Sequence, residues 1–416
     1  MLPQWKASND RLAQSDSYRL ALAAVYANIF LVMTGLGALF PALPEIQSEF
    51  RASYAGVSWA VSAFAIARLL TNLPAGAATA RYPQLPLLIG GSAAVALGSL
   101  LVAISPDLKV FLLARAVSGV GSSICTTVGL TFVLNATKPE RRGRASGLFH
   151  SALAGGAFLG PGFGGLLASL VGWRGAMLGA AGAAALSTLV LSCVVRVGVP
   201  RVAIPKTRTS VVAPSSSPPG ALVQYVTYLR LASGAYAAAF SIFFVRGAIQ
   251  QTLIPLIAHD VVGLSTAALS ILLMGATAIA SLLGPGVGAL SDRIGRQRTI
   301  VPALILFAFG TILVTQSSQT APFVVGALLT GIAGAANSLP SSMIADMVDD
   351  AHRGYAISLY RVVGDLALTV APALSGWIAD MSGFGLSGYI IASLLLLVLL
   401  LVRRDYVQQG HVAANV

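Results

Sequence analysis

Arg142-Gly143-Arg144-Ala145, in the first half of this chain, is repeated in the second half as Arg353-Gly354-Tyr355-Ala356. The similarity extends further, because Leu148, Pro161 and Gly165 are matched by Leu359, Pro372 and Gly376, each 211 residues later. The segments that follow both copies are long and apolar enough to cross a membrane. A repeat built from such segments indicates two helical bundles of the same design, as in transporters whose substrate site lies between the halves.

The composition places the chain in a membrane. Of its 416 residues, 56% are hydrophobic and only 10% are charged, which is too little polar surface to cover a soluble globule of this size. A helix needs about 20 apolar residues to cross a hydrocarbon core roughly 30 Å thick, and twelve stretches of the sequence meet this requirement. The sequence therefore predicts an all-α integral membrane protein with twelve transmembrane helices in two pseudo-symmetric six-helix bundles.

A stretch rich in Pro and Ser, from Arg196 to Gln224, marks the boundary between the bundles, because its composition is typical of a flexible linker. The first eighteen residues are polar and lack the apolar centre of a cleavable signal peptide, so the first helix is expected to direct insertion. We expect five regions: a cytoplasmic tail at 1–19, an N-terminal bundle at 20–195, a cytoplasmic linker at 196–230, a C-terminal bundle at 231–402 and a cytoplasmic tail at 403–416.

The distribution of Lys and Arg predicts the orientation in the membrane. With both termini in the cytoplasm, 19 of these residues lie on the cytoplasmic side and three, Arg51, Lys109 and Arg174, lie on the other. Cytoplasmic loops retain positive charge, so we expect a multi-pass plasma membrane protein with cytoplasmic N- and C-termini, in a bacterial inner membrane given the short loops. This topology absorbs most of the net charge of +12 without a nucleic-acid partner.

Residues suited to enzymatic chemistry do not gather in the sequence. Cys125 and Cys193 each lie within a hydrophobic segment, so neither a disulfide framework nor a thiolate metal site is indicated. The four histidines are scattered, and the chain has no glycine-rich phosphate-binding loop. We expect no enzymatic activity, no cofactor and no bound metal, and we expect a small-molecule substrate and membrane lipids as partners.

The sequence from Gly288 to Arg298, Gly-Ala-Leu-Ser-Asp-Arg-Ile-Gly-Arg-Gln-Arg, is similar to the signature loop of the major facilitator superfamily. The chain resembles this family along nearly its whole length, and within it the drug:proton antiporters with twelve helices. The resemblance implies a monomer and a conformational gate formed by Asp292, Arg293, Gly295 and Arg296. Alternatively, the basic residues of this loop serve only the membrane topology.

The first-half copy of this loop departs from the family pattern. It retains Gly76 and Arg81, but Ala80 stands where the family has an Asp and Pro83 where it has a second Gly. The gate is therefore expected to depend more heavily on Asp292.

Two further motifs carry the resemblance. The segment from Gly156 to Gly165 is similar to the antiporter signature, which is carried here by Gly156, Gly160, Pro161, Gly164 and Gly165. Small residues four apart also permit close helix packing, so ordinary packing is the alternative. Arg115, in Arg-Ala-Val-Ser-Gly-Val-Gly, matches a motif whose Arg is linked to proton relay, although its side chain could instead reach the outer surface.

Five ionisable residues are expected to lie deep in the membrane: Arg68, Arg115, Arg246, Arg361 and Asp365. Burying a charge without a partner or water costs several kcal/mol, so each of them is a candidate functional residue. The one acid, Asp365, lies ~16 Å along its helix, near the middle of the membrane. Arg361 lies one turn earlier, where the two side chains can meet. We interpret Asp365 as a proton carrier influenced by Arg361, with a permanent structural ion pair as the alternative.

The excess of Arg over Asp predicts a cationic substrate pocket containing Arg68 and Arg246, with Gln250 and Gln251 one turn beyond Arg246. Guanidinium groups bind carboxylates and phosphates well and suit cationic drugs poorly. Related exporters of cations usually have acids in the first helix, where this chain has Asn28. Three further residues could add hydrogen bonds or serve only helix packing: His150, Asn337 and Tyr360.

These features favour proton-coupled export of a small neutral or anionic organic compound or drug by alternating access. Substrate export would then be coupled to proton entry, the antiport mechanism. An organic-anion (carboxylate) symporter or exchanger is the alternative, since four Arg residues lie deep in the membrane. A non-transporting membrane sensor is the alternative of another class, because fold does not fix function.

Overall fold

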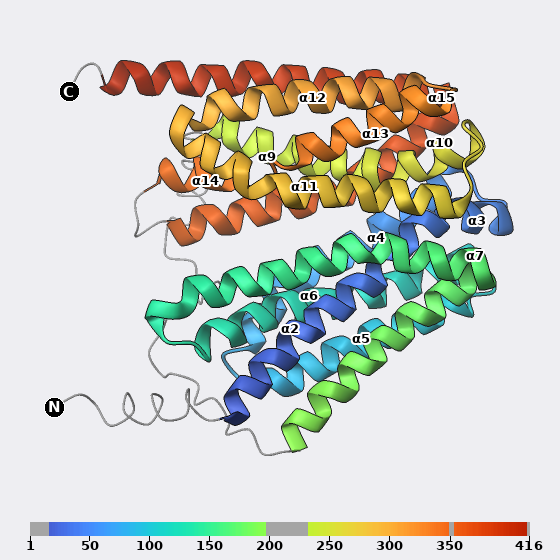
Figure 1. Cartoon of the computed structure of the whole chain (residues 1–416), viewed down its shortest axis with the longest axis vertical. Coiled ribbons are helices and arrows are strands. Elements are labelled where there is room, and N and C mark those ends of the chain that lie inside the picture. The colour runs from blue at the N-terminus through green and yellow to red at the C-terminus, as the bar shows by residue number, and fades with distance from the viewer. Residues whose placement is uncertain (1–15, 197–231, 349–352, 414–416) are drawn as a thin grey trace. The chain divides into compact units, whose positions relative to one another are not determined.

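The computed structural model describes residues 16–196, 232–348 and 353–413 (Figure 1). Within these ranges every regular element is a helix, and no strand occurs. This confirms the all-α fold class, which a membrane favours because a helix satisfies its own backbone hydrogen bonds. Nearly all of the predicted linker and most of the predicted N-terminal tail lie outside the described residues.

The helices before the linker differ from expectation at one place, the first helix. It is interrupted at Ala38, between α2 and α3. The helices of this part are α2 (Asp16–Gly37), α3 (Leu39–Phe50), α4 (Tyr54–Ala78), α5 (Gln84–Ala103), α6 (Leu108–Asn135), the 3-10 turn η1 (Pro139–Arg141) and α7 (Arg142–Arg196).

The helices after the linker contain two interruptions, one in the seventh predicted span and one in the tenth. The seventh span consists of α9 (Ser233–Val245), the π-helical stretch η2 (Arg246–Leu253) and α10 (Ile254–Asp260). The tenth is divided into α13 (Thr320–Gly334) and α14 (Leu339–Asp346). The other helices are α11 (Thr266–Ile294), α12 (Arg296–Gln316) and α15 (Arg353–Ala413).

Ten helical segments of the described part are long and apolar enough to cross a membrane. Two of them contain a kink at a glycine with positive φ, Gly172 (φ 74°) in α7 and Gly383 (φ 78°) in α15. Glycine adopts this conformation without steric cost. Each of these segments therefore consists of two helices, which accounts for the difference between ten segments and the twelve helices predicted.

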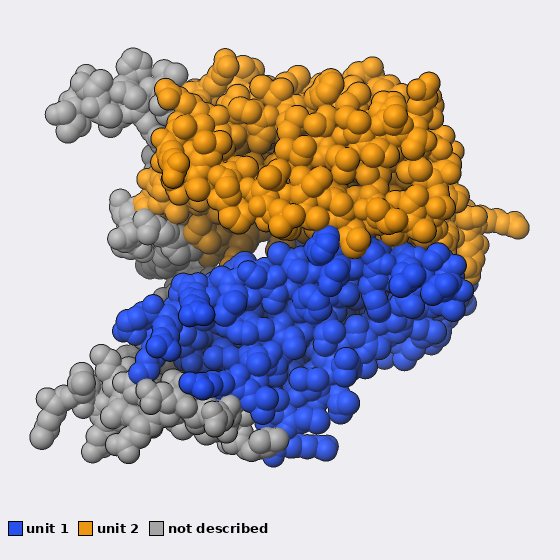
Figure 2. Space-filling model, in the orientation of Figure 1, with its two compact units in different colours: residues 1–39, 66–213 blue, residues 40–65, 214–416 orange. Residues whose placement is uncertain are grey.

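The chain divides into two compact units, drawn in different colours in Figure 2. Unit 1 contains residues 1–39 and 66–213, and unit 2 contains residues 40–65 and 214–416. Segment 40–65, which comprises nearly all of α3 and the first half of α4, packs with unit 2, although the sequence assigns it to the N-terminal bundle. The chain passes between the units at the interruption after α2 and again within α4.

Candidate functional site

The π-helical stretch η2 presents three of the predicted substrate residues, Arg246, Gln250 and Gln251. Its hydrogen bonds span five residues: the Ile254 N–H donates to the Ile249 carbonyl, and the Thr252 hydroxyl donates to the Gly247 carbonyl at 2.9 Å. Such stretches are rare and often occur at functional sites. Arg246, Gln250 and Gln251 are all half-buried.

The break between α13 and α14 lies close to η2. Gln250 Nε2 donates to the Thr330 carbonyl on α13 at 3.1 Å. A Cβ atom placed on Gly334 would lie 3.7 Å from Asn337 Nδ2 and 3.9 Å from Gln250 Nε2, so both amide groups lie beside this glycine. Asn337 Oδ1 is buried without a hydrogen-bond partner among the described residues. Two interrupted helices thus lie close together in unit 2, and the unpaired Asn337 Oδ1 is available there to accept a hydrogen bond.

Tyr360 lies on α15, in the span that precedes the Gly383 kink, and connects this span with the region around η2. Its ring packs edge-on against Phe243 of α9, with centroids 5.8 Å apart. Its hydroxyl lies close to Ser341 of α14 and within electrostatic reach of the Arg246 and Arg361 guanidinium groups. The structure therefore brings together Tyr360, Arg246 and Arg361, which the sequence had indicated separately.

Asp365 lies one turn beyond Arg361 on α15. Its side chain is buried, with 9% exposed, whereas Arg361 is exposed. Between them lies Gly364, where an added Cβ would come within 2.8 Å of the Phe243 ring, so α15 and α9 are in close contact here. The Thr369 hydroxyl, a further turn along, is buried without a partner among the described residues. Unit 2 thus combines two cations, a buried acid and unpaired polar atoms on three helices.

The predicted site residues of unit 1 have different surroundings. Asn28 is only 1% exposed and donates to the hydroxyls of Ser92 and Ser187, so it joins α2 to α5 and α7. His150 is exposed, and its Nδ1 lies 2.9 Å from the Ser146 carbonyl of its own helix. These contacts favour a packing role for Asn28.

The two deep arginines of unit 1 differ in burial. Arg115, on α6, is 4% exposed, and Arg68, on α4, is half-buried. Both have polar interactions within the protein.

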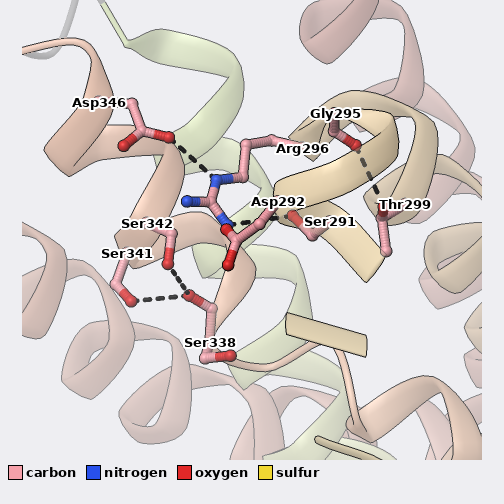
Figure 3. Close-up of polar contacts among 9 residues, drawn as sticks. All are labelled: Ser291, Asp292, Gly295, Arg296, Thr299, Ser338, Ser341, Ser342 and Asp346. Carbon is pink, nitrogen blue, oxygen red and sulfur yellow. Dashed lines mark hydrogen bonds and ion pairs between the residues drawn. The ribbon is translucent and has the colours of Figure 1, made fainter. Parts of the chain in front are cut away.

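The predicted gate in unit 2 is an ionic cluster at the junction of α11 and α12 (Figure 3). Arg296 forms ion pairs with Asp292, one turn earlier, and with Asp346 of α14, where Nε and Oδ2 are 2.9 Å apart. It also donates to the Ser291 hydroxyl at 3.2 Å. Gly295 has a φ of 99°, so the signature glycine provides the sharp turn that aligns the two helices.

Asp346 was missed by the sequence analysis, because it is 50 residues from Arg296 and belongs to no recognised motif. Its position at the end of a span, opposite a basic loop, was the only available signal. Arg293 is exposed. In the first-half copy, Gly76 accepts a hydrogen bond from the Thr79 hydroxyl at 2.7 Å, and Arg81 is exposed.

The glycines of the predicted antiporter motif form the contact between α7 and α2. An added Cβ would lie 2.8 Å from Met33 Cβ at Gly156 and 2.7 Å from Gly37 Cα at Gly160. At Gly164 it would lie 2.6 Å from Ala38 Cβ. Pro161 lies beside Gly37 in this contact, and Gly165 is also buried. Only glycine allows this approach, and it occurs where the first span is interrupted.

Comparison with known proteins identifies relatives at low identity. Multidrug resistance protein 2 of Bacillus subtilis (strain 168) is 28% identical over 142 residues, which is 34% of this chain and 36% of that protein. Drug efflux pump JefA of Mycobacterium tuberculosis (strain CDC 1551 / Oshkosh) is 26% identical over 161 residues, 38% of this chain and 32% of that protein. The chain thus spans about a third of the length of these curated relatives.

Solved structures match over nearly the whole chain. A bacterial homolog of the human lysosomal transporter Spinster has a TM-score of 0.74 at 15% identity, covering 94% of this chain and 97% of that one. The human organic anion transporter MFSD10 (TETRAN) has a TM-score of 0.66 at 18% identity, covering 94% and 100%. At these identities the likeness shows the fold alone.

The family itself follows from a broader match. The model of the Major Facilitator Superfamily matches residues 25–288 and 236–415, and these two matches leave out only the ends of the chain. With the all-helical fold, the apolar spans and the signature loop around Gly295, this match shows that the chain belongs to the Major Facilitator Superfamily.

Proposed function

We propose that this protein is a proton-coupled exporter of small neutral or anionic organic compounds that works by alternating access. As a multi-pass membrane protein of a transporter family, it is a transporter rather than an enzyme. The names of its relatives, a multidrug resistance protein and a drug efflux pump, support export as the direction. Both termini are proposed to be cytoplasmic, with the protein a monomer in a bacterial inner membrane.

The observation that carries the proposal is the buried carboxyl group of Asp365 on the helix that also presents Arg361. Asp365 is 9% exposed, and Arg361, one turn earlier, lies with Arg246 within electrostatic reach of Tyr360. A carboxyl group buried in a membrane protein is costly to keep charged, so a change in its surroundings can shift it between its charged and protonated forms. This property is what a proton carrier requires.

Coupling follows if proton and substrate compete for the same charges. With Asp365 ionised, its carboxylate can accept hydrogen bonds from a polar substrate held beside the nearby guanidinium groups, whereas a proton on Asp365 removes this acceptor and lowers the affinity for the substrate. A ligand shifts the conformational equilibrium only through its different affinity for the two states. Proton entry would therefore favour one state of the transporter and substrate the other.

An organic-anion carrier is the second candidate function. The electrostatic proximity of both Arg246 and Arg361 to the Tyr360 hydroxyl suits a carboxylate, because guanidinium groups bind carboxylates through two parallel hydrogen bonds. In that case Asp365 and Arg361 would form a lasting ion pair, and transport would proceed by symport or exchange.

The test is proton movement in proteoliposomes that contain a pH-sensitive dye and are exposed to neutral, cationic and anionic compounds. If outward substrate flux moves protons inward and Asp365→Asn abolishes this coupling, the exporter proposal is supported. If only anions respond, Asp365→Asn retains coupling and Arg246→Gln abolishes transport, the protein is an anion carrier instead.

A further inference from the structure

We propose that Tyr54 and Asp380 form a lock at the outer end of the second span, and that its release is required to open the transporter to the outside. The proposal rests on the alternating access proposed above and on the proposed orientation, which places both residues on the outer side. All the contacts that carry it lie within unit 2.

The first contact joins Asp380 of α15 to the N-terminus of α4. One carboxylate oxygen accepts from the Tyr54 N–H and the other from the Ala55 N–H, both at 2.8 Å. The first N–H groups of a helix have no partner within it, and a carboxylate binds them well. These N–H groups are usually capped by a residue at the start of the same helix, yet Asp380 lies more than 300 residues away.

Helix α4 also has a cap from the residue that precedes it, so Asp380 is not needed to define where the helix begins. The Ser53 hydroxyl accepts from the Gly56 N–H at 3.1 Å, the usual arrangement for a serine that precedes a helix. Asp380 is therefore an additional acceptor whose main consequence is to join two spans. We infer that it serves the contact between α4 and α15.

The side chain of Tyr54 adds contacts to two other spans. Its hydroxyl donates to Asp260 Oδ2 at the end of α10, at 3.0 Å. Its ring packs against Phe384, just past the Gly383 kink, with centroids 4.7 Å apart. Tyr54 thus contacts the end of α10 and, through Asp380 and Phe384, the two parts of α15 on either side of Gly383.

Behind Tyr54 the two helices are in direct backbone contact. A Cβ atom on Gly376 would lie 2.6 Å from the Tyr54 carbonyl oxygen, and the Ala373 N–H donates to the Ser62 hydroxyl at 3.2 Å. Ser58 and Ser62 are completely buried. Helices α4 and α15 are thus closely packed, with buried serines at the contact. Any opening on this side must separate the two helices.

The test uses Ser58→Cys as a probe, because this position is hidden while the lock is closed. Cells expressing the variant in a Cys193→Ser background are treated from outside with a membrane-impermeant maleimide, and the initial labelling rate is measured. Asp380→Asn keeps one acceptor and Asp380→Ala keeps none, so we expect the rate to rise in the order wild type, Asn, Ala. Loss of a helix cap predicts a rise of about tenfold for Ala, equivalent to ~1.4 kcal/mol.

The matched control is Asp107→Ala. Asp107 also caps a helix on the proposed outer side, accepting from the Val110 N–H at 2.9 Å, but it does so within α6 alone. We expect it to leave the labelling of Cys at position 58 unchanged. Lys109→Cys, at an exposed position, provides the orientation control, because it must be labelled from outside if the proposed topology holds.

Two results would overturn the lock: wild-type labelling in both Asp380 variants, or equal acceleration by Asp107→Ala. If Asp380→Ala does not fold, as judged by size-exclusion chromatography, Asp380→Asn alone decides by the same criterion. Labelling requires neither substrate nor proton coupling. If the labelling results support the lock while Asp365→Asn remains fully coupled, the proton mechanism is rejected and the lock is retained.

Discussion

Arg296, the first residue of α12, pairs with Asp346 at the end of α14 through an Nε to Oδ2 contact of 2.9 Å. The same guanidinium group also holds Asp292, so one cation joins two acids from different helices. Both acids are more than half exposed, at 62% for Asp292 and 57% for Asp346. Exposed ion pairs contribute little stability, which suggests that the cluster influences which state is populated rather than whether the protein folds.

We therefore expect Asp346→Ala to change the transport rate by roughly two- to fivefold, the factor that corresponds to an exposed ion pair of up to ~1 kcal/mol. Because both variants remove the same interaction, Arg296→Ala combined with Asp346→Ala should be less severe than the product of the single effects. Initial uptake rates in proteoliposomes measure this double-mutant cycle. Fully multiplicative effects would show that the two residues act independently.

Replacing the glycines between α7 and α2 should destabilise the protein. Gly160→Ala places a Cβ atom 2.7 Å from Gly37 Cα, where backbone must move, and overpacking of this kind costs about 1–3 kcal/mol. Gly182→Ala, in the part of α7 that follows the Gly172 kink, is the control because its added Cβ meets no atom within 4 Å. We expect a lower apparent Tm of the purified protein for Gly160→Ala only. Equal Tm values for the two variants would contradict this packing.

Asn28 offers a test of packing against substrate binding. Its amide group donates to Ser92 and Ser187 in a buried position, so Asn28→Ala removes both hydrogen bonds and should cost about 1–3 kcal/mol. We expect a lower apparent Tm with an unchanged KM for every transported compound. A KM that rises for some compounds and not for others would show that Asn28 contributes to substrate binding.

Arg246 should discriminate substrates by charge. Arg246→Gln removes a cation near the Tyr360 hydroxyl, so KM should rise for anionic compounds by about tenfold or more and change little for neutral ones. Arg246→Lys keeps the charge but loses the planar fork, so it should restore transport only in part. Both effects are measured by how strongly a series of compounds of similar size and different charge inhibits the uptake of one transported compound. Equal KM changes for neutral and anionic compounds would contradict a role in charge selection.

The sequence predicted the all-helical class, the family and the turn in the signature loop, because apolar length and the glycine turn at Gly295 are local properties. It did not predict the π-helical stretch or the break before α14, although a proline follows each of them. Pro255 and Pro340 have no N–H, so neither can donate the helical hydrogen bond to the carbonyl four residues earlier. A proline alone does not distinguish a bend, a π-helical stretch and a break.

The contacts of Asp346 and Asp380 could not be predicted, because each joins residues far apart in the chain. The internal repeat did identify Gly376 as the counterpart of Gly165, and both glycines are buried. The motifs that contain them have different neighbours, however: Gly376 touches α4, whereas Gly164, next to Gly165, touches Ala38 at the end of α2. A repeat predicts shared helix design, and the partners of each helix depend on the packing of the whole unit.

The most direct test of proton coupling at Asp365 compares exchange with accumulation. Proteoliposomes containing wild type or Asp365→Asn are loaded with a transported compound, and both labelled-substrate exchange at equal pH and accumulation driven by a pH gradient are measured. If Asp365 is the proton carrier, Asp365→Asn will retain exchange and lose gradient-driven accumulation, because the binding pocket remains while the titrating group is gone. Gradient-driven accumulation at the wild-type level in Asp365→Asn would contradict the central proposal.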